Sequence, residues 1–244
     1  MDLKSLGKNW DEFGKKDPLL FILFDENRRS EAWGKSEFFN TGEHEIKDVV
    51  DYLKALKTVL TRKRALDFGC GIGRTTQALT KYFDYVYGVD IAPSMIKQAK
   101  KYAGKNKKCI YYLNKESHLK LFQENYFDFI YSNITLQHME SQYAKSYIAE
   151  FMRILNKGGV LVFQIPSDKI FSIKDFLTGI VPKFLLDRFR RYRYGTSAVM
   201  EMHGIQKKIV VKMLRKNGGK ILGIRKNSTA GKGWTSYMYS VRKI

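Results

Sequence analysis

Asp67 and three glycines stand close together in the stretch ALDFGCGIGRTT, residues 65–76. Asp67 ends an apolar run, and Gly69, Gly71 and Gly73 alternate after it before a helix-like segment begins. Glycines at a strand-to-helix turn let a ligand approach the backbone closely, and the start of the helix offers free N–H groups. The stretch therefore predicts a binding loop for a ligand with a polar, nucleotide-like body.

Asp90 is a second acid at the end of an apolar run, in YGVDIAPSM. An acid at that strand end, about 20 residues past the glycines, can accept hydrogen bonds from ribose hydroxyls. Ile91 and Met95 are then placed to flank an adenine. Helix capping or turn formation is the alternative interpretation of Asp67 and Asp90, but their occurrence at matched strand ends favours a ligand.

The spacing of the glycines argues against a dinucleotide. The G-x-G-x-x-G fingerprint requires a third glycine at position 74 or 76, where Arg74 and Thr76 stand. Asp67 would also repel phosphates, whereas a carboxylate suits a cationic ligand such as one that bears an ammonium group. An NAD-linked oxidoreductase is therefore a weaker alternative.

Proton transfer would need a group such as histidine, and the chain has four: His44, His118, His138 and His203. His138, in NITLQHM just beyond the run FDFIYS, is the best placed to act as a base. A structural histidine that hydrogen-bonds a neighbouring loop is the alternative. Neither the acids nor the cysteines and histidines have the spacing of metal ligands, so we expect no metal.

These residues must be positioned by alternating strands and helices. The predicted strands are nearly continuous apolar runs, as in a parallel sheet covered on both faces: RALDF, YVYGVD, CIYYL, FDFIYS and VLVFQI. Pro166 is expected to stop the last of them. In a doubly wound sheet of this kind, ligands bind at the carboxyl ends of the strands.

Helices are predicted between these strands from apolar spacing and capping residues. They cover 43–60, GRTTQALTKYF, a segment opened by Pro93, and a segment from Ser141 to Leu155 that Gly158 and Gly159 would terminate. A further helix over 204–217 and two strands, GKILGIRK and WTSYMYSVRK, close the chain.

Composition fits one α/β domain, because 44% of the 244 residues are apolar. Cys70 and Cys109 form no disulfide framework, and the longest apolar run, LLFILF, is too short to span a bilayer. We expect a cytoplasmic protein. The net charge of +20 would draw anionic partners such as nucleic acid, anionic lipid or a phosphorylated substrate, but a solvated lysine-rich surface explains it equally simply.

Four motifs together resemble those of class I S-adenosylmethionine-dependent methyltransferases: LDFGCGIGRTT, VDIAPSMIKQAK, FDFIYSNITLQHM and RILNKGGVLVF. The resemblance implies a Rossmann-like, doubly wound, seven-stranded α/β sheet, mostly parallel with an antiparallel last strand. It also implies an N-terminal helical extension and a helical insertion after strand five, all in one domain. The segments would be 1–45 (lid or extension), 60–165 (cofactor core), 167–203 (substrate-side insertion) and 204–244 (closing helix and strands).

The resemblance further implies S-adenosylmethionine as cofactor and S-adenosylhomocysteine as product. Asp67 and the loop Gly69, Cys70, Gly71 and Gly73 would hold the methionine part, and Asp90 the ribose. Ile91 and Met95 would pack on the adenine. Glu116 and Ser117 occupy the place where the family has an acid and a small residue, although the acid is shifted here. Ser132 and Asn133 would face the reacting methyl group, and His138 is the catalytic candidate.

Two segments outside these motifs are candidates for covering the site. Residues 10–46 resemble one bacterial and archaeal subgroup of the same enzymes, and Trp33, Phe38 and Phe39 are predicted either to form an aromatic lid or to pack on the sheet edge. The insertion places apolar residues beside basic ones: Phe176, Leu177, Ile180, Phe184 and Leu185 against Arg188, Arg190, Arg191 and Arg193. It predicts first a helical cap, then an anion-binding rim, then peripheral membrane contact through 173–193.

The expected function is methyl transfer to an oxygen or nitrogen of a small-molecule, glycan or lipid-linked acceptor, anionic acceptors included. RNA methylation is the alternative within methyl transfer. Against it, SNIT stands where an Asn-Pro-Pro-Tyr-like segment would read a base. A domain that binds the cofactor without catalysis is the remaining alternative.

Overall fold

The computed structural model describes residues 1–23, 34–170, 188, 196, 198–231 and 233–244. Trp33 and nearly all of the apolar and basic residues predicted to form the insertion's cap lie outside these ranges. Arg188 alone of that set is described, and its side chain is exposed. None of the helices in the described ranges is long and apolar enough to cross a membrane.

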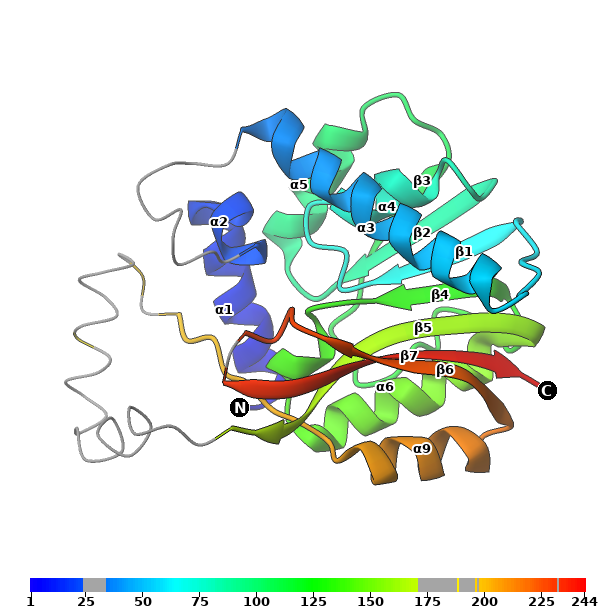
Figure 1. Ribbon diagram of the computed structural model, residues 1–244. Helices are drawn as coiled ribbons and strands as arrows, with labels where there is room; N and C mark the ends of the chain where they lie inside the picture. Colours follow the sequence, from blue (N-terminus) through cyan, green and yellow to red (C-terminus); the bar gives the residue numbers. More distant parts are fainter. Residues whose placement is uncertain (24–33, 171–187, 189–195, 197, 232) are drawn as a thin grey trace.

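The fold is built on one seven-stranded sheet in the order β3-β2-β1-β4-β5-β7-β6 (Figure 1). Its strands are β1 (Arg64–Phe68), β2 (Tyr85–Asp90), β3 (Cys109–Leu113), β4 (Phe127–Ser132), β5 (Leu155–Lys169), β6 (Gly219–Asn227) and β7 (Trp234–Lys243). The first five pair in parallel, whereas β7 runs antiparallel to both β5 and β6. The predicted sheet, with its antiparallel last strand, is confirmed.

Helices cover both faces of the sheet (Figure 1). One side carries α3 (Lys35–Ala55), α4 (Arg74–Leu79) and α5 (Pro93–Ala103), and the other carries α6 (Ser141–Ile154) and α9 (Lys207–Lys216). The N-terminal helices α1 (Leu3–Lys16) and α2 (Pro18–Ile22) stand beside the carboxyl ends of the parallel strands. A short 3₁₀ turn, η2 (Leu136–His138), follows β4. The extension is therefore helical, as predicted.

Several predicted boundaries are wrong. The helix predicted over 43–60 is α3, which begins at Lys35 and ends at Ala55, and the helix predicted over GRTTQALTKYF ends already at Leu79. Gly158 and Gly159 do not end α6, which stops at Ile154 because Leu155 already pairs with Phe127 in the sheet. Pro166 does not stop β5, which continues to Lys169. Proline is tolerated there because β4 ends opposite Phe163, so β5 has lost one neighbour at that point, and the pairing with β7 is irregular beyond Pro166.

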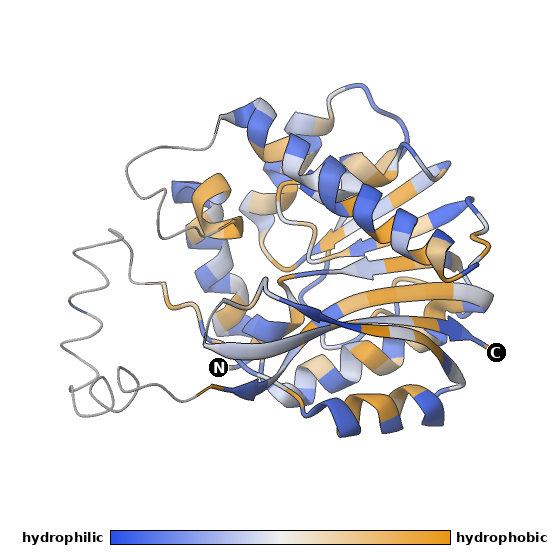
Figure 2. Cartoon of the chain, in the orientation of Figure 1, coloured by the Kyte–Doolittle hydropathy of each residue, from blue (hydrophilic) through white to orange (hydrophobic). Residues whose placement is uncertain are grey.

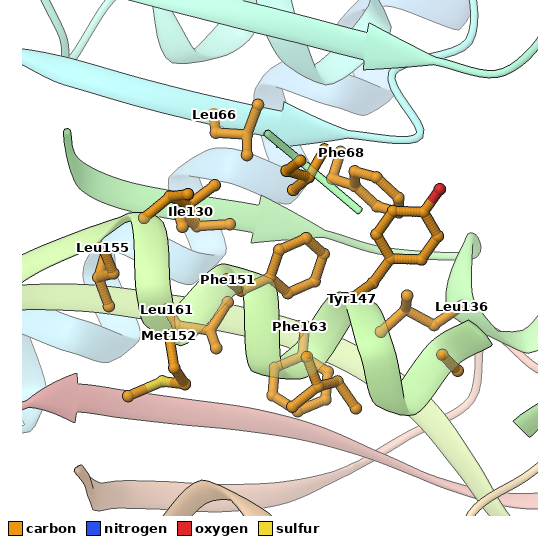
Figure 3. Close-up of a cluster of buried hydrophobic side chains, with 14 of the residues drawn as sticks. Leu66, Phe68, Ile130, Leu136, Tyr147, Phe151, Met152, Leu155, Leu161 and Phe163 are labelled. Atoms are coloured by element: carbon orange, nitrogen blue, oxygen red, sulfur yellow. The ribbon is translucent and has the colours of Figure 1, made fainter. Parts of the chain in front are cut away.

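The core has two halves because alternate strand residues point to opposite faces. Leu66 and Phe68 of β1 pack into the cluster under α6, whereas Ala65 packs under α3 and α4. Figure 3 shows the first cluster, in which the rings of Phe68 and Tyr147 lie 4.5 Å apart. Figure 2 shows apolar residues concentrated on the central strands, while apolar and hydrophilic residues alternate along the helices. This packing holds the end of β1 rigidly against α6.

Candidate active site

The glycine-rich loop after β1 is left-handed and tightly packed. Gly69 and Gly71 have φ of +75° and +52°, a region that side chains other than glycine rarely adopt. A Cβ atom on Gly69 would lie 2.2 Å from side-chain atoms of Thr135. The N–H groups of Gly69 and Cys70 both donate to the carbonyl of Val89, at 2.8 and 3.0 Å. The loop is therefore fixed against the ends of β2 and β4.

Asp90, at the end of β2, anchors the same loop. Its Oδ2 accepts a hydrogen bond from the Gly71 N–H at 2.9 Å, and its Oδ1 accepts one from the Ala92 N–H at 2.9 Å. Burial raises the pKa of the carboxyl group, and these two donors oppose that effect. Each oxygen keeps a further lone pair for a ligand, and Asp90 lines a cavity.

That cavity opens at the carboxyl ends of the strands, as the sequence analysis expected. With its open mouth it encloses about 880 Å³, a size typical of small-molecule sites. Among the predicted residues it is lined by Gly69, Cys70, Gly71, Asp90, Ile91, Asn133 and His138. The structure therefore brings together the loop, the β2 acid and the turn after β4.

Helix α1 forms one wall of the cavity through Leu3, Leu6 and Trp10. It is held on α5, because Asp11 accepts a hydrogen bond from the Ser94 N–H at 2.7 Å. Two of the three aromatic side chains predicted as a lid are described, and they lie elsewhere: Phe38 is fully buried in a cluster with residues of α1 and α2, and Phe39 packs edge-on against Tyr102. The signal that sequence analysis missed is the helical spacing of Leu3, Leu6 and Trp10.

Asp67 lies beneath the loop and not on the cavity wall. Only 2% of it is exposed, and its Oδ2 accepts hydrogen bonds from the hydroxyls of Thr75 and Thr76 at 2.8 and 2.6 Å. Burial raises its pKa to about 6. Gly73, with φ of +87°, is the N-cap of α4 and also lies off the wall. The predicted contact of Asp67 with a ligand stays a prediction, while its visible role is to hold the first turn of α4.

Arg74 and Glu45 both line the cavity and form an ion pair that the sequence analysis missed. The Arg74 Nη2 lies 2.7 Å from the Glu45 Oε2. Glu45 also accepts hydrogen bonds from the Tyr131 hydroxyl at 2.7 Å and from the Asn133 amide at 3.0 Å. Burial alone would raise the pKa of Glu45, but the Arg74 charge and these donors lower it. A cation in the first turn of a helix opposes the helix dipole, which was the available signal that Arg74 needs an acidic partner.

The remaining predicted residues contribute mainly to packing. Met95 is buried among Phe13 and Phe21. The Ser132 hydroxyl is buried and donates to the Phe68 carbonyl at 3.0 Å. Glu116 and Ser117 do not line the cavity.

The wall beside β3 is instead formed by Asn114 and Tyr147. The Asn114 amide donates to the Glu116 carbonyl at 3.1 Å, and the Tyr147 hydroxyl donates to the same oxygen. Asn114 directly follows β3, and Tyr147 comes from α6, so the position of Tyr147 is set by the packing of that helix. Both are polar side chains that a ligand can contact from the cavity.

His138 lies on the wall with both ring nitrogens hydrogen-bonded. Its Nδ1 is 2.9 Å from the Glu201 carbonyl, and its Nε2 is 3.2 Å from the Gln137 amide nitrogen. Its ring meets Trp10 edge-on at 5.1 Å. Burial lowers the pKa of His138 to about 4, so the imidazole is neutral at pH 7. Its role as a base stays a prediction.

The chain is similar to known methyltransferases in part of its sequence. Residues 66–163 match a family described as "Methyltransferase domain". Over 98 residues the chain is 33% identical to a malonyl-[acyl-carrier protein] O-methyltransferase from Hamiltonella defensa. The aligned part makes up 40% of this chain and 36% of the length of that protein. The chain thus spans about a third of that relative.

Solved structures resemble the chain over all or most of its length. Magnesium protoporphyrin IX methyltransferase from Synechocystis PCC 6803 with bound SAH superposes with a TM-score of 0.68 at 17% identity, covering 100% of both chains. A SAM-dependent methyltransferase from Methanosarcina mazei gives a TM-score of 0.60 at 20% identity, covering 78% of this chain and 97% of the other. These likenesses establish the fold.

Proposed function

We propose that the chain is a class I S-adenosylmethionine-dependent methyltransferase that methylates a small-molecule acceptor, because residues 66–163 match a methyltransferase-domain family. The observation that carries the proposal is that one cavity joins the Gly69–Gly71 loop and Asp90 to the turn that holds Asn133 and His138. A cofactor and an acceptor bound at these two ends would lie side by side.

The cavity residues fit S-adenosylmethionine. Asp90 would bind the ribose hydroxyls, and Ile91, with Leu3 and Leu6 of α1, would enclose the adenine. Gly69 and Gly71 present bare backbone to the cavity, where the methionine part would lie, and a Cβ on either residue would meet a neighbouring side chain within 3 Å. Bound there, the cofactor supplies an electrophilic methyl group on a sulfonium.

The protein's contribution is to orient the reactants and to exclude water. Orientation alone can be worth roughly 7–11 kcal/mol of the barrier. Leu3, Leu6 and Trp10 close one side of the cavity with apolar surface. Because Arg74 is paired with Glu45 and His138 is neutral, neither places an uncompensated positive charge beside a sulfonium.

The acceptor atom we propose is an oxygen that carries no proton at neutral pH, such as a carboxylate oxygen. His138 supports this choice, because its Nε2 already has a hydrogen-bond partner in Gln137 and its pKa of about 4 makes it a weak base. The names of the similar proteins mention an O-methyl transfer to a malonyl group and a porphyrin substrate. Those substrates are suggestions for classes to test here.

Label transfer tests the proposal. The chain would be incubated with methyl-labelled S-adenosylmethionine and a panel of small carboxylic acids, alcohols, amines and RNA. We expect base-labile label, as in a methyl ester, in the carboxylic acids. Label in amines or RNA alone would refute the carboxylate assignment, and no label transfer to any acceptor in cell extract would refute the enzyme.

A further inference from the structure

A chain of buried side chains connects β5 to the cavity wall. Gln164 of β5 and Gln137 are 0% and 2% exposed, and His138 is 4% exposed. The Gln164 Oε1 accepts from the Ile134 N–H at 3.1 Å, and its Nε2 donates to the Gln137 Oε1 at 3.0 Å and to the Ser236 hydroxyl at 2.7 Å. The Gln137 Nε2 then meets the His138 Nε2.

The groups at the two ends of this hydrogen-bonded series determine which side chain donates and which accepts in each of its hydrogen bonds. The Ile134 N–H can only donate, so the Gln164 oxygen must face it and the Gln164 amide group must face Gln137. The Gln137 oxygen therefore accepts, and its own amide group must donate to His138. At the far end, the Glu201 carbonyl can only accept, so the His138 Nδ1 must carry the proton.

The same series of hydrogen bonds holds a strained turn in place. Ile134 has φ of +56°, which is costly for a β-branched residue, and its N–H is the one that Gln164 accepts. The next residue, Thr135, is the side chain that a Cβ on Gly69 would strike. Gln164 therefore supports the point where the turn after β4 touches the glycine loop.

We propose that Gln164 and Gln137 are positioning residues, which hold His138 as the neutral imidazole protonated on Nδ1 and hold Ile134 and Thr135 against the glycine loop. The part of the proposal that concerns support of a cofactor-binding loop rests on the proposed function. The neighbouring titratable groups are Glu201, whose carbonyl is the acceptor, and His203, whose Nε2 lies 3.1 Å from the Glu201 carboxylate.

Nitrogen NMR of histidine-labelled protein tests the hydrogen-bond directions without any ligand. The His138 signals are those lost in His138→Gln. At pH 7 we expect Nδ1 protonated and Nε2 unprotonated. In Gln137→Glu a carboxylate would accept from both Gln164 and His138, so both nitrogens of His138 should be protonated at pH 7. A wild-type proton on Nε2 would overturn the proposal. If that variant does not fold, the wild-type spectrum decides.

Calorimetry with S-adenosylhomocysteine tests the support of the loop. We expect Gln164→Met to raise the dissociation constant for S-adenosylhomocysteine by roughly five- to tenfold. That change corresponds to the free energy of about one hydrogen bond. Gln77→Met, at a glutamine with a buried amide nitrogen on α4, is the control and should change it less than about twofold. Equal effects of the two variants would overturn the positioning role. If the wild-type protein does not bind S-adenosylhomocysteine, the proposed function fails and the NMR result still decides the hydrogen-bond chain.

Discussion

The Arg74 guanidinium lies 2.7 Å from the Glu45 carboxylate, and the two side chains come from helices on the same side of the sheet. Arg74 is 6% exposed and Glu45 20%, so little water reaches the pair. The pair joins α3 to the start of α4 and, through Asn133, to the turn after β4. A substitution at either residue should therefore change the structure at both ends of the cavity.

Removing one partner of this pair should destabilise the fold strongly. We expect Arg74→Met to lower the free energy of unfolding by about 3–5 kcal/mol, because it leaves the Glu45 charge buried without its partner. The double variant Arg74→Met, Glu45→Leu should recover most of that loss. Urea unfolding measures both, and a double variant no more stable than the single one would contradict the pairing.

Gly69→Ala should weaken cofactor binding more than it destabilises the fold. The new Cβ would lie 2.2 Å from Thr135 and force the loop away from its position. Gly104→Ala is the matched control, because Gly104 also has positive φ, at +56°, but has nothing within 4 Å of a Cβ. Backbone strain should lower the free energy of unfolding of both variants by about 1–2 kcal/mol. Only Gly69→Ala should raise the dissociation constant for S-adenosylhomocysteine. Equal effects on binding would show that the contact with Thr135 is unimportant.

Asp67 should make stability depend on pH between about 4 and 6. Its pKa in the folded protein is raised from 3.8 to about 6, so the stability it contributes is present below pH 3.8 and is lost as the pH rises through 6. The shift corresponds to about 3 kcal/mol, as an order of magnitude. Chemical unfolding across this range should show a slope that Asp67→Asn reduces. The same slope in both proteins would refute the raised pKa.

His138 should leave the rate of methyl transfer unchanged between pH 5.5 and 8. Its folded pKa is lowered from 6.5 to about 4, so the stability it contributes is present above 6.5 and declines as the pH falls towards 4. The rate would be measured with a carboxylic acid found in the label-transfer panel, using the wild type and His138→Gln. A rate that falls below pH 6.5 in the wild type and not in the variant would instead identify His138 as the base.

The strands, the glycine loop and Asp90 could be predicted because their signals are local. Apolar runs end at Asp67 and Asp90, and alternating glycines lie between them. The Arg74–Glu45 pair, Tyr147 and the wall made by Leu3 and Leu6 depend on how separate helices pack. In the sequence, Arg74 indicates only a missing glycine, because its partner Glu45 lies 29 positions earlier in the chain. For the same reason the sequence does not show that Met95 is covered by α1 and α2.

Calorimetric titration with S-adenosylhomocysteine tests the central claim most directly, because it asks whether Asp90 and the glycine loop hold the cofactor. We predict that the wild type binds and that Asp90→Asn weakens binding by roughly 10- to 100-fold, the loss of hydrogen bonds to a charged acceptor. Asp51→Asn, on the outer face of α3 and paired only with Lys47 and Lys54 among the described residues, should bind like the wild type. No heat from the folded wild type, or equal affinity in Asp90→Asn, would contradict the account.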